Sequence, residues 1–221
     1  PGNEGYFHIY ESNIQPTGLV TSVQLFKSLK DTDYHEATPF YSSKLNSVFY
    51  VLSNTENGEL AFDSNGKNAL AIAKQAIGGS YQLLLKDLST SFYYPFYDDA
   101  SGKLYFSADF EDSYGGTDIY YVYTNNGQVM SAPINLGPRI NSPGNEVAPY
   151  IFENSLYFAS DVFYGLGGMD IYKSNIEDDG FGIPINLGEP INTEFDDFGM
   201  IIRNEGDGLL GYIASNRKGG K

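Results

Sequence analysis

Short apolar runs alternate with polar, Gly-rich segments along the chain, and the pattern repeats. Residues 103–137 and 155–188 carry the same succession, and Asp118 precedes Asp170 by 52 positions. Each copy has two runs of β-branched and aromatic residues, LYFSAD with DIYYVY and LYFASD with DIYKSN, joined across a Gly-Gly pair. Such runs predict a strand, a turn and a second strand. Self-similarity at a period of about 50 residues indicates a repeat architecture.

Each repeat contains four predicted strands. In the clearest copy they span 146–152, 155–161, 169–175 and 182–188. Matching segments divide the chain into half a unit, three whole units and half a unit, with boundaries 1–30, 31–88, 89–141, 142–193 and 194–221. The first whole unit has a polar, Gly-rich insertion at 57–67, predicted as a loop or short extra turn. Its third strand, at 69–75, is rich in Ala, so a short helix is an alternative there.

Four-stranded antiparallel sheets repeated around a common axis form a β-propeller. We therefore predict an all-β propeller with blades of about 50–55 residues. A linear β-solenoid is disfavoured because its repeats are shorter, and a β-sandwich requires no repeat. The two half units leave two arrangements open. They can join into a composite closing blade, which gives four blades in total, or the chain can be part of a larger ring.

The pattern inside the repeats agrees with blades that stack face to face. An inner strand that is buried on both faces has a nearly continuous apolar run, as in LYFAS at 156–160, where Leu156 and Phe158 point to one face. The Gly-Gly pairs predict turns with positive φ. Three prolines recur in the first strands and lack an N–H group. We expect them at a strand start or a sheet edge, and they are Pro39, Pro95 and Pro149.

Composition and charge restrict the classes of partner and of chemistry that we expect for this chain. The chain has 221 residues with 19 Tyr, 15 Phe and 25 Gly, which suits short strands and tight turns. A formal charge of −15 offers no basic patch for nucleic acid or an anionic membrane, so neither is an expected partner, and we interpret the acidity as surface solubility. Cysteine is absent, which excludes a disulfide framework and a thiolate site.

Candidate catalytic residues are few. The two histidines are His8, on a predicted strand, and His35, on an acidic loop, and there is no G-x-S-x-G motif. Gly206, Gly208 and Gly211 match G-x-G-x-x-G, but strand-like residues on both sides predict a hairpin turn rather than the strand–helix junction of a dinucleotide site. We therefore expect no catalytic residue and no cofactor.

Acidic side chains gather in two loops of the clearest repeats. Calcium prefers carboxylate oxygens, so the candidates for a calcium site are Asp109, Asp118, Asp161 and Asp170. However, the EF-hand spacing is absent, and a repeated Asp in a tight turn more often caps backbone N–H groups. We therefore expect a structural role and no metal. The same role is expected for the acidic residues at the head of the first strands, Glu36, Glu146 and Asp196.

The motifs resemble a known family. LYFASD followed by GG-x-DIY resembles TolB-like, WD-like β-propeller repeats. Together with PINLG-x-x-INS, DDFG and SNRKGGK, the pattern looks like the propeller segment of OmpA-family lipoproteins of Bacteroidetes, including the PorE-type component of type IX secretion. The match is strong over 93–221 and looser over 1–92. In the family the SNR-x-GG turn continues into another DIY strand, which implies that this chain is a fragment of a larger protein.

The resemblance implies a non-enzymatic protein-interaction scaffold in the periplasm, associated with the outer membrane. Its partners would be other envelope and secretion proteins. Peptidoglycan would be bound only through an OmpA-like domain that this chain lacks. Two alternatives stay open: the propeller domain of a TolB-like peptidase or other hydrolase, and a calcium- or glycan-binding module that uses the acidic loops.

Overall fold

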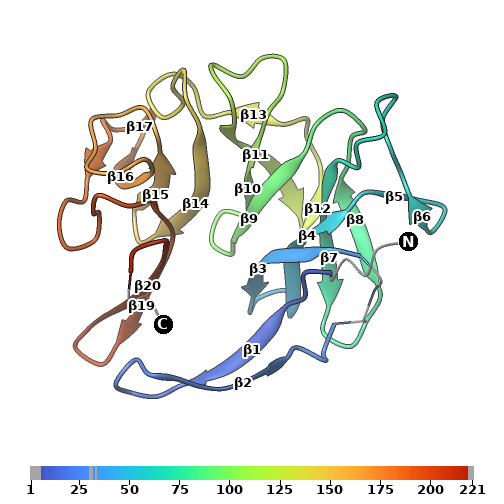
Figure 1. Ribbon diagram of the computed structural model, residues 1–221, viewed down its shortest axis with the longest axis horizontal. Helices are drawn as coiled ribbons and strands as arrows, with labels where there is room; N and C mark the ends of the chain where they lie inside the picture. Colours follow the sequence, from blue (N-terminus) through green and yellow to red (C-terminus); the bar gives the residue numbers. More distant parts are fainter. Residues whose placement is uncertain (1–5, 30–31, 33, 219–221) are drawn as a thin grey trace.

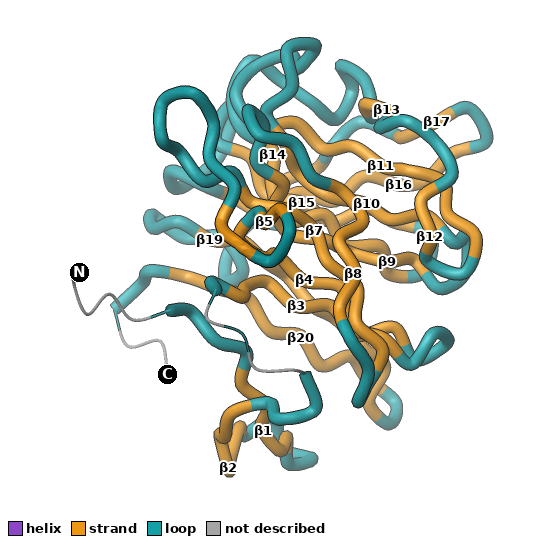
Figure 2. The backbone as a smooth tube through the Cα atoms, turned by 90° about the vertical axis from the view of Figure 1, so that its right-hand side faces the viewer, coloured by secondary structure: helices purple, strands orange, loops and turns teal. Residues whose placement is uncertain are grey.

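The computed structural model describes residues 6–29, 32 and 34–218. Within these ranges every regular element is a β-strand, and the strands are linked only by turns and loops (Figure 2). The part described contains no helix with the length and apolar character needed to cross a membrane. The prediction of an all-β fold is confirmed.

Three antiparallel sheets form from the three whole repeats, and they stand around a common axis (Figure 1). The first sheet has the order β3-β4-β7-β8, with bounds Glu36–Ser42, Ser47–Ser53, Leu70–Ala76 and Tyr81–Leu85. The second consists of β9 (Phe92–Asp98), β10 (Lys103–Ala108), β11 (Asp118–Asn125), β12 (Gln128–Val129) and β13 (Ile134–Asn135). The third consists of β14 (Glu146–Phe152), β15 (Ser155–Ser160), β16 (Asp170–Glu177), β17 (Gly180–Phe181) and β18 (Ile185–Asn186).

Two-stranded sheets account for the rest. The half units form hairpins, β1 (Tyr10–Ile14) with β2 (Val20–Leu25) and β19 (Asp197–Glu205) with β20 (Gly208–Ser215). The turn of the first hairpin contacts the second, because the Tyr212 hydroxyl donates to the Gly18 carbonyl at 2.9 Å. The insertion in the first whole repeat forms a small hairpin of β5 (Thr55–Glu56) and β6 (Glu59–Leu60). The Ala-rich segment is strand β7, not a helix.

The predicted fourth strand at 182–188 is not continuous. β17 pairs with the end of β16, and β18 pairs with the middle of β16. Pro184 lies between them, and because it has no N–H it cannot continue the ladder. The Ser174 hydroxyl instead donates to the Gly182 carbonyl at 2.7 Å. β12 and β13 divide around Pro133 in the same way.

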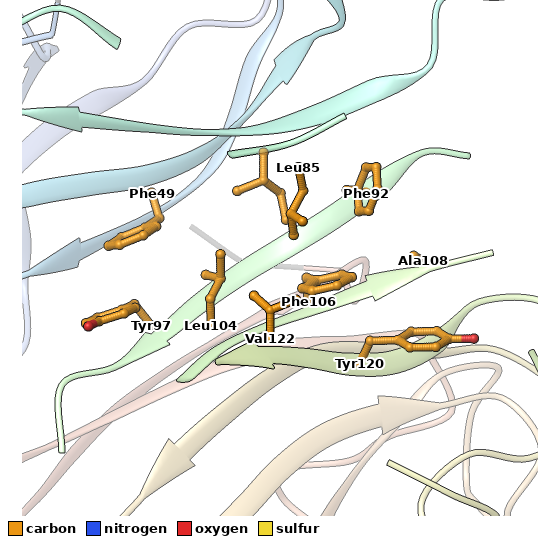
Figure 3. Close-up of a cluster of buried hydrophobic side chains, with 10 residues drawn as sticks. Phe49, Leu85, Phe92, Tyr97, Leu104, Phe106, Ala108, Tyr120 and Val122 are labelled. Atoms are coloured by element: carbon orange, nitrogen blue, oxygen red, sulfur yellow. The ribbon is translucent and has the colours of Figure 1, made fainter. Parts of the chain in front are cut away.

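Aromatic and aliphatic side chains fill the space between neighbouring sheets. Between the first and second sheets, Phe49 stacks on Tyr97 with ring centroids 4.7 Å apart, and Phe106 and Tyr120 continue the layer (Figure 3). Between the second and third sheets, Ile119 packs with the cluster that contains Phe158. A buried aromatic side chain removes about 150–250 Å² from water, which is worth several kcal/mol at about 25 cal/mol per Å². Stacking of sheet on sheet therefore supplies the core.

The Gly-Gly pairs have a different role from the one predicted. None of Gly115, Gly116, Gly167 and Gly168 has a positive φ. Each instead lies so close to the next sheet that a Cβ would overlap it. A Cβ on Gly115 would strike the Pro143 backbone. The expectation of positive-φ turns was wrong, because close approach between repeats, not turn geometry, excludes a side chain here.

One hydrogen bond recurs at every junction between consecutive repeats. The acceptor is the side chain of the residue just before each first strand. The donor is a backbone N–H at the start of the segment that forms the third strand of the preceding repeat. The donor–acceptor pairs are Phe7–His35 Nδ1 (3.2 Å), Leu70–Ser91 Oγ (3.2 Å), Thr117–Asn145 Oδ1 (3.0 Å) and Met169–Asp196 Oδ1 (3.1 Å). We call this set the junction clasp.

A second bond ties each clasp residue to its own sheet. Its backbone N–H donates to the side chain of the residue at the end of the second strand or directly after it. The pairs are His35–Ser53 (3.3 Å), Ser91–Asp109 (3.3 Å), Asn145–Asp161 (2.7 Å) and Asp196–Asn216 (3.0 Å). Asp196 is thus the counterpart of Asn145, and Asp197 is the counterpart of Glu146, since Asp197 and Glu146 pair with Ser215 and Ser160 respectively. The assignment of Asp196 to the head of the first strand is corrected to Asp197.

We predict that Gly115→Ala destabilises the fold by about 1–3 kcal/mol, because the added methyl group must displace backbone atoms of the next sheet. The measurement is the free energy of urea unfolding. The matched control is Gly208→Ala, where a Cβ would lie 3.9 Å from its nearest neighbour and where a change within about 0.5 kcal/mol is expected. Equal effects at the two positions would contradict the close-approach explanation.

Candidate functional site

The structure places the four acidic loop residues against N–H donors. Asp118 accepts the Tyr114 N–H at 2.8 Å and the Asn135 side-chain amide at 2.7 Å. Asp170 accepts the N–H groups of Leu166 and Gly167. Both carboxylates therefore cap the loop that precedes their strand.

Asp109 and Asp161 belong to the junction bonds described above. Asp161 also accepts the Asn145 side-chain amide, at 2.7 Å. In the part of the chain that the structure describes, no group of three or more His, Asp or Glu side chains could hold a metal ion. The four candidates are thus distributed over two repeats and are not brought together around one point.

The histidines lie apart from any reactive constellation. His35 Nδ1 accepts the Phe7 N–H at 3.2 Å, and the His35 backbone donates to Ser53 Oγ at 3.3 Å. Both contacts belong to the first junction. His8 is partly buried and precedes β1.

Asn side chains of the PINLG-x-x-INS motif bridge each outer segment to its own third strand. Asn141 accepts the Ile119 N–H at 2.8 Å and donates to the Ile119 carbonyl at 3.0 Å, so it pairs like a neighbouring strand. Asn192 makes the same pair of bonds with Ile171. Both amides are buried. The motif therefore ends one repeat and leads the chain to the head of the next.

The buried acidic residues at two strand heads have pKa values that are shifted in opposite directions. Glu146 accepts bonds from Ser142 Oγ (2.5 Å) and Ser160 Oγ (2.6 Å), but burial outweighs them and raises its pKa. Burial also acts to raise the pKa of Asp197. Hydrogen bonds, including those from Arg217 and Thr193, nevertheless hold this pKa below the ordinary value. One structural position thus holds a carboxyl of high pKa in one repeat and of low pKa in the next.

The inner edges of the sheets line an open cavity of about 430 Å³. The innermost strands β3, β9, β14 and β19 follow one another around the axis, and each contacts the next. The cavity walls are mostly apolar. They are formed by Thr38, Pro39, Phe40, Tyr94, Pro95, Phe96, Ala148, Pro149, Tyr150, Phe198, Gly199, Met200, Ile201 and Ala214. We call this space the axial cavity.

A β-bulge at the same place in each innermost strand shapes the walls. The pairing register shifts at these points, and one residue takes a positive φ: Thr38 (46°), Tyr94 (50°), Ala148 (54°) and Gly199 (63°). The prolines follow the first three of these residues, on edge strands as predicted but in mid-strand. Such a φ costs about 1–2 kcal/mol for a residue other than Gly, so the first three bulges are strained and the bulge at Gly199 is not.

Aromatic rings line the axial cavity in a connected row. Phe96 lies 4.7 Å from Phe40 and 4.9 Å from Tyr150 between centroids, with edge-to-face geometry. Tyr94 lies 6.4 Å from Phe198. Burial raises the pKa of both Tyr94 and Tyr150, so these walls stay uncharged at neutral pH.

Sequence reasoning missed the axial cavity, although a signal was present. A residue pair of proline and aromatic stands at the same point of three first strands, at 39–40, 95–96 and 149–150. The proline and the ring occupy successive positions of an edge strand, where side chains alternate between the two faces. The motif was interpreted only as an edge marker.

No protein-family model matches the chain, and no curated protein matches it in sequence. Among solved structures, the chain is similar to a puromycin-hydrolyzing peptidase of Mycobacterium tuberculosis, with a TM-score of 0.50, 18% identity, and coverage of 81% of this chain and 28% of the peptidase. It also superposes on an endo-arabinase of Bacteroides thetaiotaomicron (TM-score 0.49, 13% identity, 90% and 76% coverage) and on an alpha-L-arabinofuranosidase of Lactobacillus brevis (TM-score 0.43, 11% identity, 80% and 63% coverage).

The likeness to the peptidase, at a TM-score of 0.50, supports a shared fold and corrects one expectation. That protein is an enzyme, so the prediction that this chain is not an enzyme is contradicted. The chain spans 28% of the length of the peptidase. At 18% identity this likeness shows a shared fold.

We predict opposite pH dependences for the two strand-head carboxyls. Because the folded pKa of Glu146 is raised, its contribution to stability is fully present below its ordinary pKa of 4.5 and is lost as the pH rises through the folded value. Glu146→Gln should therefore flatten the fall in unfolding free energy above pH 4.5. Urea unfolding across a pH series measures this.

Asp197→Asn is the comparison variant. The folded pKa of Asp197 is lowered, so its contribution is present above the ordinary value of 3.8 and is lost as the pH falls through the folded value. This variant should be less stable at pH 7 by about 3 kcal/mol, because Arg217 loses its buried partner. If both substitutions changed the pH dependence of the unfolding free energy in the same direction, the explanation that Arg217 lowers the pKa of Asp197 would be wrong.

Proposed function

We propose that this chain is the β-propeller part of a hydrolase of the peptidase class, in which the axial cavity receives a segment of the substrate. The observation that carries the proposal is the axial cavity itself. Its volume of about 430 Å³ lies in the range of ligand pockets, which are concave, mostly apolar and contain few polar groups. All four innermost strands contribute to it, so a bound segment would lie between the three whole repeats and the C-terminal half unit.

The likeness to the peptidase supports the choice of reaction class. The shared fold covers 81% of this chain and 28% of the peptidase. The hydrolytic groups would then lie in another part of the polypeptide, and the propeller would bind substrate. The periplasmic location that the family resemblance implies is part of this proposal.

The test uses the product of the full coding sequence that contains this chain. We expect it to release the chromophore from apolar aminoacyl anilides. Ile201→Asp, in a residue that is 54% exposed and lines the axial cavity, should lower kcat/KM by about tenfold, since it places a charge on an apolar wall. The control is Tyr164→Asp, on a loop residue that is 97% exposed, where kcat/KM should not change.

Two results would refute the proposal. One is the absence of hydrolysis toward anilide, ester and capped peptide substrates. The other is hydrolysis that responds equally to the two aspartate substitutions, because the axial cavity would then have no part in it.

A further inference from the structure

We propose that the two half units of the chain close on each other, so that strand β20 pairs with strand β1 and a fourth blade is completed. The open edge of β20 is thereby assigned to one occupant, which is β1 of the same chain. The inference goes beyond the proposed function and does not depend on it.

Strands β1 and β20 each have an unpaired edge. β1 pairs with β2 and β20 pairs with β19, and the described residues form no ladder between the two hairpins. In each whole repeat, by contrast, the second strand pairs with the third, as β15 does with β16. An unpaired edge presents a row of N–H and C=O groups that another strand can satisfy.

The sequences of the two strands are those of a third and a second strand. Residues 9–13 read IYESN, and the corresponding residues 171–175 of β16 read IYKSN. Residues 211–216 read GYIASN, and the corresponding residues 156–161 read LYFASD. Each half unit therefore contains the strand type that the other half unit lacks.

A side chain that is buried in the third repeat is exposed in β1. The junction clasp aligns β1 with β16, so that Tyr10 corresponds to Tyr172. Tyr172 is 2% exposed and lies 6.0 Å from Phe158 of β15 between ring centroids, whereas Tyr10 is 60% exposed. Ile213 of β20 stands at the position of Phe158. Pairing of β20 with β1 would give Tyr10 the apolar neighbour that its counterpart has.

Together the half units already make the junction bonds of one whole repeat. A whole repeat is joined to the preceding repeat by the residue before its first strand, and to the next repeat by the start of its third strand. The C-terminal half unit makes the first bond through Asp196, and the N-terminal half unit makes the second through Phe7. The innermost strands at the two ends of the series, β3 and β19, line the same axial cavity. The half units thus stand on the two sides of one blade position.

Contacts between the hairpins favour pairing within one chain over pairing between two copies. The Tyr212 hydroxyl donates to the Gly18 carbonyl at 2.9 Å, and a Cβ on Gly18 would lie 3.2 Å from the Leu210 side chain. The hairpins are neighbours in Figure 1. Two segments that one polypeptide holds close together meet at a far higher effective concentration than segments of separate molecules.

The alignment also defines the register to be tested. Leu156 pairs with Ser174 in the third repeat, so Gly211 should pair with Ser12. The experiment introduces Ser12→Cys and Gly211→Cys together into the full-length protein, because this chain has no cysteine of its own. Directly opposite positions of paired strands bring Cβ atoms to the separation of a disulfide. We expect mild oxidation to link residues 12 and 211 within one chain in most molecules, as identified by peptide mass spectrometry and a non-reducing gel.

The control combines Ser12→Cys with Leu210→Cys. This pair is shifted by one residue, which moves one cysteine to the opposite face of β20, so its yield of disulfide should be lower by about tenfold. Equal yields from the two pairs, or no disulfide in the first pair, would overturn the inference. A disulfide that joins two chains would also overturn it, because a second copy would then be the occupant.

Hydroxyl-radical labelling of the unmodified full-length protein gives a second readout. Closure predicts that Tyr10 is oxidised as slowly as its buried counterpart Tyr172. Oxidation as fast as that of Tyr164, which is 97% exposed, would contradict closure. Neither experiment measures hydrolysis, so a failure of this inference is distinguishable from a failure of the proposed function.

Discussion

The junction between consecutive sheets rests on a pair of hydrogen bonds at the residue that precedes each innermost strand. Its side chain accepts a backbone N–H from the preceding repeat, and its own N–H is held by its own sheet. His, Ser, Asn and Asp all serve as this residue. Each offers a short acceptor at the required distance, which is the chemical property that the position needs. Backbone N–H groups at sheet ends that lie outside the ladder need such partners.

The junction clasp and the hydrophobic core both determine how neighbouring sheets are placed. The clasp sets where each innermost strand begins, and the aromatic layers between sheets set the spacing behind it. Together they bring four edge strands to the axis, where unpaired edges would otherwise be exposed. Bulges and prolines prevent these edges from pairing with each other or with another strand. The axial cavity is thus a consequence of how the repeats join, and prolines and bulge residues form part of its walls.

The repeat, the strands and the all-β class could be predicted because they depend on local composition and period. Features that depend on contacts between repeats could not. The Gly-Gly pairs have the composition of a turn, and only the nearness of Pro143 and Asn145 reveals why a side chain is excluded. The acidic pair at 196–197 was misassigned by one residue because both residues are Asp, and only the pairing of Asp197 with Ser215 identifies the strand head. The axial cavity needs side chains from four strands, so no single segment of the sequence displays it.

The most direct measurement of this account is amide hydrogen exchange at the four clasp donors, Phe7, Leu70, Thr117 and Met169. If these bonds hold the sheets together, all four amides will exchange only with unfolding of the sheets, at protections near that of the core strand residue Phe106. Exchange as fast as that of the exposed loop residue Tyr164, with the core amides still protected, would contradict the account.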